Sequence, residues 1–114
     1  PHLLPISRGI LSTIYAPLKK EVSEDQVLDL YHSIYEDQFF IRVLDKDCLP
    51  ATQHVRGSNF CDIGIKIDSR TNRLIITAAI DNIVKGASGQ AVQNMNLMCG
   101  FDETSGLKNI PLFP

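Results

Sequence analysis

The amino-acid sequence predicts an α+β domain in which a mixed, mainly antiparallel sheet carries helices on one face. Three observations favour this class: a pair of strand-like segments joined by a turn, two segments with apolar residues at helical spacing, and the order of these elements. That order is strand, helix, strand, loop, strand, strand, helix and tail. The 114 residues are enough for one domain and too few for two.

The first strand and the first helix have clear local signals. Residues 10–16 are rich in β-branched and aromatic side chains, and Pro17 fits the end of such a strand better than its centre. Ser23 is placed to cap a helix, and Gln26 follows three residues later, which is the capping-box pattern. Apolar residues then recur at spacings of three and four, so we expect a helix that ends between residues 35 and 37.

The middle of the chain predicts a further strand and an antiparallel hairpin. Residues 39–44 are typical of a strand, and a polar loop follows them. Between Asp62 and Ile67, polar or small residues alternate with apolar ones, the pattern of a strand with one buried face. After a turn, the apolar run at 74–80 forms the partner strand and indicates that both faces of the sheet are covered. A second copy of the chain is the simplest cover, so we expect a homodimer or a dimer of dimers.

The residues that follow the hairpin have the most chemical content. A turn containing Gly86 and Gly89 leads into a helical pattern that ends at Gly100, a plausible left-handed cap. Free N–H groups and the positive end of a helix dipole attract anions, so this helix start is a candidate anion-binding site. A stripe of small and apolar residues predicts that the helix docks on the sheet; it comprises Ala87, Ala91, Met95 and Met98, with Val92 beside it.

Composition excludes several classes of function. The net charge is −2 without a basic patch, so we expect no nucleic-acid partner. No apolar run approaches the roughly 20 residues that span a bilayer, so we expect no membrane partner. Cys48, Cys61 and Cys99 match no metal-binding spacing, and buried inert thiols in a reducing compartment are the simplest interpretation. No metal site is expected.

Sequence motifs alone do not define a reaction. The G-x-G-x-x-G fingerprint is absent, and Gly86 with Gly89 gives only a weak G-x-x-G. Lys85 precedes the first glycine, so there is no phosphate-binding lysine pattern of the P-loop type. Arg8 lies at a bend before the first strand, where it is either a structural arginine or a guanidinium that grips a carboxylate or phosphate.

Four blocks of the chain carry a family resemblance. Residues 4–11, 56–60, 79–96 and 100–107 resemble, in the same order, segments of the N-acetyl-gamma-glutamyl-phosphate reductases. The resemblance implies a fold of the semialdehyde-dehydrogenase dimerisation-domain type and a cytoplasmic enzyme of arginine biosynthesis. Such enzymes reduce N-acetyl-glutamyl phosphate to the semialdehyde with release of phosphate, using NADPH.

The resemblance also implies that the reactive residues lie elsewhere. The family's nucleophilic cysteine lies in a Gly-Cys-Tyr-Pro-Thr type motif and its acid/base histidine in a His-Arg-His-x-Pro-Glu type motif, and this chain has neither. We therefore assign no catalytic residue here and expect this fragment to be inactive alone. Because Pro1 does not resemble a natural start, residues 1–114 are expected to be the C-terminal catalytic and dimerisation domain of a longer reductase. NADP would be bound mainly by an N-terminal domain.

Positions within the resembling blocks give the candidate site residues. The candidates for holding the carboxylate or phosphate of the acyl-phosphate substrate are Arg8, Ser58 and Asn59. The candidates for approaching the cofactor are Asn82, Lys85, Gly86 and Gly89. Tight packing of the helix on the sheet is the alternative role for the glycines, and a surface charge is the alternative for the lysine. A domain of an aspartate-semialdehyde dehydrogenase and a non-enzymatic dimerisation module are the other interpretations.

Overall fold

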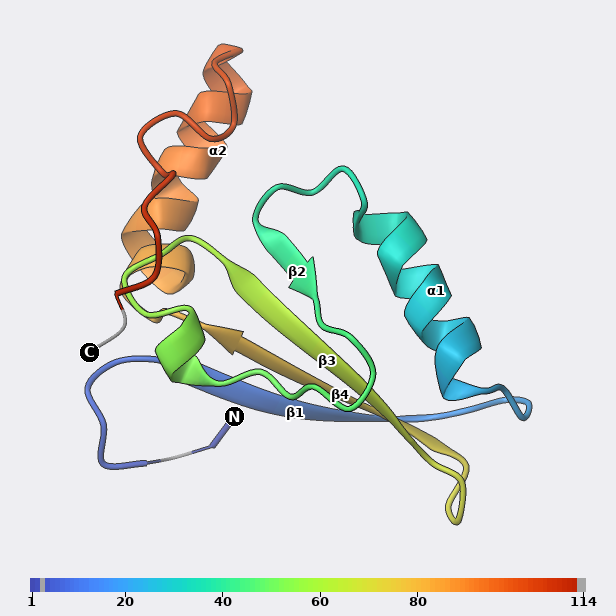
Figure 1. Cartoon of the computed structure of the whole chain (residues 1–114). Coiled ribbons are helices and arrows are strands. Elements are labelled where there is room, and N and C mark those ends of the chain that lie inside the picture. Colours follow the sequence, from blue (N-terminus) through green and yellow to red (C-terminus); the bar gives the residue numbers. More distant parts are fainter. Residues whose placement is uncertain (3, 113–114) are drawn as a thin grey trace.

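The computed structural model describes residues 1–2 and 4–112. It consists of a four-stranded sheet with one helix on a face and a second helix at the end of the sheet (Figure 1). The elements are β1 (Ile10–Pro17), α1 (Glu24–Tyr35), β2 (Ile41–Val43), β3 (Cys61–Asp68), β4 (Arg73–Ile80) and α2 (Gly89–Cys99). Two short turns of helix, η1 (Thr52–His54) and the π-helical η2 (Val84–Ser88), complete the order.

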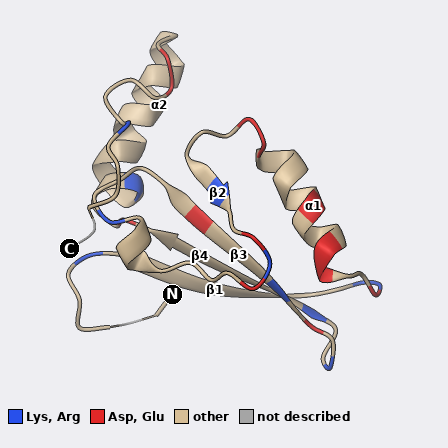
Figure 2. Ribbon diagram, viewed as in Figure 1, with Lys and Arg blue, Asp and Glu red and all other residues tan. Residues whose placement is uncertain are grey.

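The sheet is mixed, as the sequence predicts. Its strand order is β1-β4-β3-β2, with antiparallel pairs β1/β4 and β3/β4 and one parallel pair, β2/β3. The predicted hairpin is confirmed, with Asp68 opposite Arg73 beside its turn. The α+β class with a mainly antiparallel sheet is therefore confirmed. Figure 2 shows that acidic and basic residues are interspersed over helices, strands and loops.

Helix α1 begins at the predicted capping box. The Gln26 N–H donates to Ser23 Oγ (3.1 Å), and the Ser23 N–H donates to Gln26 Oε1 (2.9 Å), so two free N–H groups are satisfied reciprocally. The helix lies over one face of the sheet, where Val27 packs into a core with Ile63, Ile65 and Leu74. This core therefore combines the apolar face of the helix with the apolar face of β3, both of which the sequence predicts.

The face of β3 opposite α1 is also buried, whereas the sequence pattern predicts a strand with one buried face. Asp62 is only 2% exposed, and a Cβ on Gly64 would lie 2.7 Å from Pro50 Cδ. The prediction of a single buried face is wrong here, because the crossover from β2 to β3 lies over the face opposite α1. Arg42 forms a two-pronged ion pair with the buried carboxylate of Asp62 (Nε–Oδ1 2.6 Å, Nη2–Oδ2 2.9 Å). That contact compensates the burial of the charge.

Strand β2 is shorter than predicted. It spans Ile41–Val43, whereas residues 39–44 have strand-like composition. Phe39 and Phe40 instead lie in the preceding turn and form an aromatic cluster with Phe60, with ring centroids 5.1–6.0 Å apart. Phe40 is 2% exposed, so aromatic packing rather than strand pairing accounts for the apolar character of these positions.

Helix α2 does not dock on the sheet through the predicted apolar stripe. It extends away from the end of the sheet (Figure 1), with Met95 50% and Met98 87% exposed. Its buried residues are Gly89, Gln93 and Asn96. The prediction is wrong because the tail after the helix packs on this polar side: Asn96 Nδ2 donates to the carbonyls of residues 103 (3.2 Å) and 105 (3.0 Å). The left-handed cap at Gly100 is confirmed (φ 72°).

Among residues 1–2 and 4–112, neither helix is both long and apolar enough to cross a membrane.

Candidate functional site

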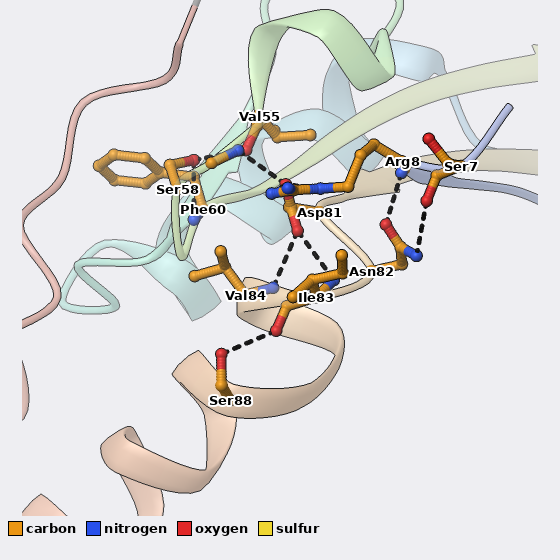
Figure 3. A network of polar contacts seen from close by, with 12 residues as sticks. Ser7, Arg8, Val55, Ser58, Phe60, Asp81, Asn82, Ile83, Val84 and Ser88 are labelled. Atoms are coloured by element: carbon orange, nitrogen blue, oxygen red, sulfur yellow. Dashed lines mark hydrogen bonds and ion pairs between the residues drawn. The ribbon is translucent and has the colours of Figure 1, made fainter.

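A buried carboxylate at the end of β4 joins three segments of the chain. Asp81 is fully buried and accepts hydrogen bonds from Arg8 (Nε 3.2 Å, Nη2 2.5 Å) and from the Gly57 N–H (2.7 Å). It also accepts from the N–H groups of Ile83 and Val84, both at 2.8 Å (Figure 3). The N-terminal segment, the loop before β3 and the start of the second helical region are thereby fixed to one side chain.

This arrangement changes the role of the helix start. The helical region begins at η2, before Gly89, and runs without a break into α2. Its first N–H groups already have the Asp81 carboxylate as their acceptor. The expectation of free N–H groups that attract an exogenous anion here is therefore wrong, because an internal anion occupies that position.

The electrostatics of Asp81 follow from its contacts. Burial alone would raise the pKa of this carboxyl. The hydrogen bonds from Gly57, Val84, Arg8 and Ile83 outweigh that effect and lower the pKa from 3.8 to about 2. Donors of this kind favour the ionised form, so the carboxylate stays charged at every pH near neutrality.

Asn82 fixes the backbone on both sides of Arg8. Its Oδ1 accepts from the Gly9 N–H (2.7 Å) and its Nδ2 donates to the Ser7 carbonyl (3.3 Å) (Figure 3). Gly9 has φ +102°, and a Cβ there would lie 2.6 Å from Thr52 Cβ. The glycine therefore allows the bend and the close approach to η1. The structure brings Arg8 and Asn82 together, and the Arg8 side chain remains 31% exposed.

Ser58 and Asn59 are buried and make internal contacts. Ser58 is 0% exposed and donates through Oγ to the Val55 carbonyl (2.7 Å). Asn59 is 1% exposed, and its Nδ2 donates to Gln93 Oε1 (2.9 Å). Asn59 Oδ1 has no hydrogen-bond partner among the described residues, and it lies against Gly89. These positions favour the packing alternative for Gly89, while substrate and cofactor roles stay predictions.

Lys85 belongs to a second polar cluster under α2. Its Nζ donates to Gln93 Oε1 (2.7 Å) and lies 5.4 Å from the centre of the Phe40 ring. Gln93 Nε2 in turn donates to Glu103 Oε1 (2.5 Å). Burial lowers the pKa of the Lys85 ammonium. Gly86 is exposed on η2, and its N–H donates to the Asp81 carbonyl (2.8 Å).

Sequence reasoning missed three polar residues that organise these clusters. Asp81 and Gln93 lie inside the resembling block 79–96, and Glu103 lies in the block 100–107. An acidic residue directly after a strand and three residues before the first residue of a helix is a capping signal that would have identified Asp81. Gln93 and Glu103 carry no such signal, because only the folded tail places them together. Within the part of the chain that the structure describes, no three His, Cys, Asp or Glu side chains gather to bind a metal ion.

The fold has a counterpart among known families. Residues 1–82 match the family model described as "Semialdehyde dehydrogenase, dimerisation domain". The chain belongs to this family.

Several relatives of this semialdehyde dehydrogenase domain have the same name. All 114 residues align at 64% identity with an N-acetyl-gamma-glutamyl-phosphate reductase of Desulfotalea psychrophila (strain LSv54 / DSM 12343) and at 60% with one of Geobacter sp. (strain M21). A reductase of the same name from Thermoanaerobacter sp. (strain X514) is 57% identical. In each case all of this chain is covered but only 33% of the relative, so the domain spans about a third of their length.

A solved structure has the same fold as this domain. The crystal structure of aspartate semialdehyde dehydrogenase II from Vibrio cholerae superposes with a TM-score of 0.68 at 21% identity. The match covers 85% of this chain and 29% of that protein. At this identity the likeness concerns the fold alone, and it agrees with the mixed sheet and the single covering helix.

Proposed function

We propose that this domain is part of an N-acetyl-gamma-glutamyl-phosphate reductase, a cytoplasmic enzyme of arginine biosynthesis. The reaction is the NADPH-dependent reduction of N-acetyl-glutamyl phosphate to the semialdehyde with release of phosphate. One observation carries the proposal: relatives 56–64% identical over all 114 residues bear this name. In this proposal residues 1–114 are the C-terminal catalytic and dimerisation domain, and the reactive cysteine and histidine lie outside them.

The candidate residues divide into groups in this proposal. Arg8 faces the substrate with the exposed part of its side chain. Ser58 supports the loop that binds Asp81 through Gly57, and Asn59 joins this loop to α2 through Gln93. When bound, the nicotinamide cofactor supplies the hydride. The exposed Gly86, which has no side chain to block an approach, and the half-buried Lys85 fit a surface that faces it. Asn82 and Gly89 are occupied by internal contacts, so their contribution is to hold the loop and the helix in place.

A homodimer is the proposed assembly. The core face of the sheet continues beyond α1 onto β1, where Ile10 is 37% and Ile14 is 50% exposed. Ile14 lies opposite Ile76 of β4, which is partly buried in the core. An apolar surface continuous with the core suits a second copy of the chain. Sedimentation of the full-length protein tests this assembly, and a stable monomer at micromolar concentration contradicts it.

Substrate preference of the full-length enzyme is the direct test of the proposed reaction. We expect NADPH oxidation with N-acetyl-glutamyl phosphate to exceed that with aspartyl phosphate by about 100-fold or more in kcat/KM, because a site built for one acyl group leaves polar groups unpaired with another. Steady-state kinetics with both acyl phosphates measure this ratio. The isolated domain is the control and is expected to show no turnover. A preference for aspartyl phosphate would favour an aspartate-semialdehyde dehydrogenase instead.

A further inference from the structure

A cavity of about 370 Å³ opens beside Arg8, between the N-terminal segment and η1. The polar side chains that line it come from Ser7, Arg8, Thr52, Gln53 and Arg56. Two arginines, two hydroxyl-bearing residues and one glutamine therefore line the space, and none of its lining residues is acidic. The volume is at the lower end of that found for small-molecule sites.

The charge balance of the cavity favours a single anionic group. Arg8 binds Asp81, and its side chain, which is 31% exposed, also lines the cavity. Arg56 is exposed, and its guanidinium forms no hydrogen bond or ion pair with the residues at 1–2 and 4–112. Two guanidinium groups against one buried carboxylate leave one unbalanced positive charge. An arginine fork matches the oxygens of a carboxylate or a phosphate.

The walls of the cavity are fixed before any ligand arrives. Asn82 holds the backbone on both sides of Arg8, and the bend at Gly9 brings that segment against Thr52. On the other side, the backbone of Arg56 accepts a hydrogen bond from the Leu112 N–H (2.8 Å), and the next N–H in the chain, of Gly57, donates to Asp81 (2.7 Å). The two arginines are therefore attached to the same buried carboxylate, one directly and one through its neighbour. Such preorganisation reduces the entropy lost on binding.

We propose that this cavity is an oxyanion subsite, with Arg56 as its principal ligand-binding side chain and Arg8 as a second cation held in place by Asp81. The ligand is the carboxylate or phosphate group of a small metabolite. The identity of that metabolite rests on the proposed function, in which N-acetyl-glutamyl phosphate carries both groups. The hydroxyls of Ser7 and Thr52 and the amide of Gln53 supply neutral donors around the same oxygens.

Calorimetric titration of the full-length protein with two probes tests the subsite. N-acetyl-glutamate supplies carboxylates without a reactive acyl phosphate, and inorganic phosphate supplies the other group. Arg56→Ala is expected to weaken binding of at least one probe by about tenfold or more, because a charge-assisted pair is lost. Arg56→Lys is expected to restore part of the affinity. Arg70→Ala, which removes an exposed arginine in the β3–β4 turn, is the matched control and is expected to leave both affinities unchanged.

The outcomes distinguish a carboxylate ligand from a phosphate ligand. They also test the oxyanion subsite separately from the proposed reductase function. A loss confined to N-acetyl-glutamate assigns the subsite to the substrate carboxylate, and a loss confined to phosphate assigns it to the leaving group. Wild-type protein that binds neither probe, or an Arg56→Ala variant that binds both normally, overturns the subsite. Arg56-dependent binding in a protein that does not reduce N-acetyl-glutamyl phosphate supports the subsite and contradicts the proposed function.

Discussion

Replacement of Asp81 by alanine is expected to lower the free energy of unfolding by about 3–5 kcal/mol, the range for breaking a buried charge pair from one side. The substitution leaves the N–H groups of Gly57, Ile83 and Val84 without their acceptor and the Arg8 guanidinium without its partner. Each unsatisfied buried group adds its own desolvation penalty. Urea unfolding of the 114-residue chain, followed by circular dichroism, measures the change.

An isosteric variant retains part of the hydrogen bonds and removes the charge. Asp81→Asn keeps one acceptor oxygen for the N–H groups of Ile83 and Val84 but replaces Oδ2, the acceptor for Gly57 and Arg8, with an NH2 donor. Its loss of stability is expected to be smaller than that of the alanine variant. A loss below about 1 kcal/mol in Asp81→Ala, the value of a single ordinary hydrogen bond, would contradict the central role assigned to this side chain.

The dependence of stability on pH gives a second measurement of the same contact. The pKa of Asp81 is about 2 in the folded chain, below its ordinary value of 3.8. A lowered pKa means that the unfolded state binds the proton more readily, so the contribution is complete above the ordinary pKa and disappears as the pH falls toward the folded value. The stability difference between wild type and Asp81→Asn is therefore expected to be constant above about pH 5 and to shrink between about pH 4 and pH 2. A difference that stays constant down to pH 2 contradicts the lowered pKa.

Elements with local signals were predictable from the sequence. The capping box at Ser23 and Gln26 involves residues three apart, and the hairpin from β3 to β4 involves a short turn, so each lies within one stretch of chain. The burial of Asp62 was not predictable in this way, because its cover comes from Arg42 and from the crossover loop. Alternation reports which residues share a face of a strand, but it does not report what lies over that face.

Hydrophobicity misassigned the buried side of α2 for a related reason. Met95 and Met98 form an apolar stripe that lies at the surface of this domain, whereas Asn96 is 2% exposed. The tail that accepts the hydrogen bonds of Asn96 follows the helix and doubles back on it. Periodicity in the helix alone contains no information about this partner.

The candidate site contains residues that the sequence identified locally and a contact between residues far apart in the chain. The resembling block 79–96 directed attention to Asn82, Lys85 and the two glycines, but it did not identify Asp81, which joins the segments around Arg8. The arginine and the carboxylate are 73 positions apart in the chain, so no local sequence pattern links them. Only the pairing of β1 with β4, which brings Ile10 opposite Ile80, places the residues next to these strand ends together.

Gly89→Ala is expected to destabilise the chain by about 1–3 kcal/mol, the usual range for overpacking. In the interior of an exposed helix the same change would raise the free energy of unfolding by about 1 kcal/mol. The predicted change is therefore opposite in sign to the change that helix propensity alone would give. A Cβ at this position would contact Asn59 Oδ1 and would lie 2.7 Å from Val84 Cγ1 and 2.8 Å from the Val84 carbonyl oxygen. The carbonyl belongs to the backbone of η2, so it cannot move away as a flexible side chain would.

Gly86→Ala is the matched control, because this glycine precedes Gly89 by one helical turn and is exposed on η2. Its added Cβ would meet no atom closer than the Asp81 carbonyl oxygen at 3.4 Å, an ordinary contact. The control is expected to be neutral or to stabilise by up to about 1 kcal/mol, through the lower entropy of the unfolded chain. Urea unfolding of both variants measures the change in the free energy of unfolding for each. Stabilisation by Gly89→Ala would show that helix propensity outweighs the contact with Val84. An Asn59→Ala substitution is expected to recover only part of the loss in Gly89→Ala, since it removes Oδ1 but leaves the Val84 carbonyl in place.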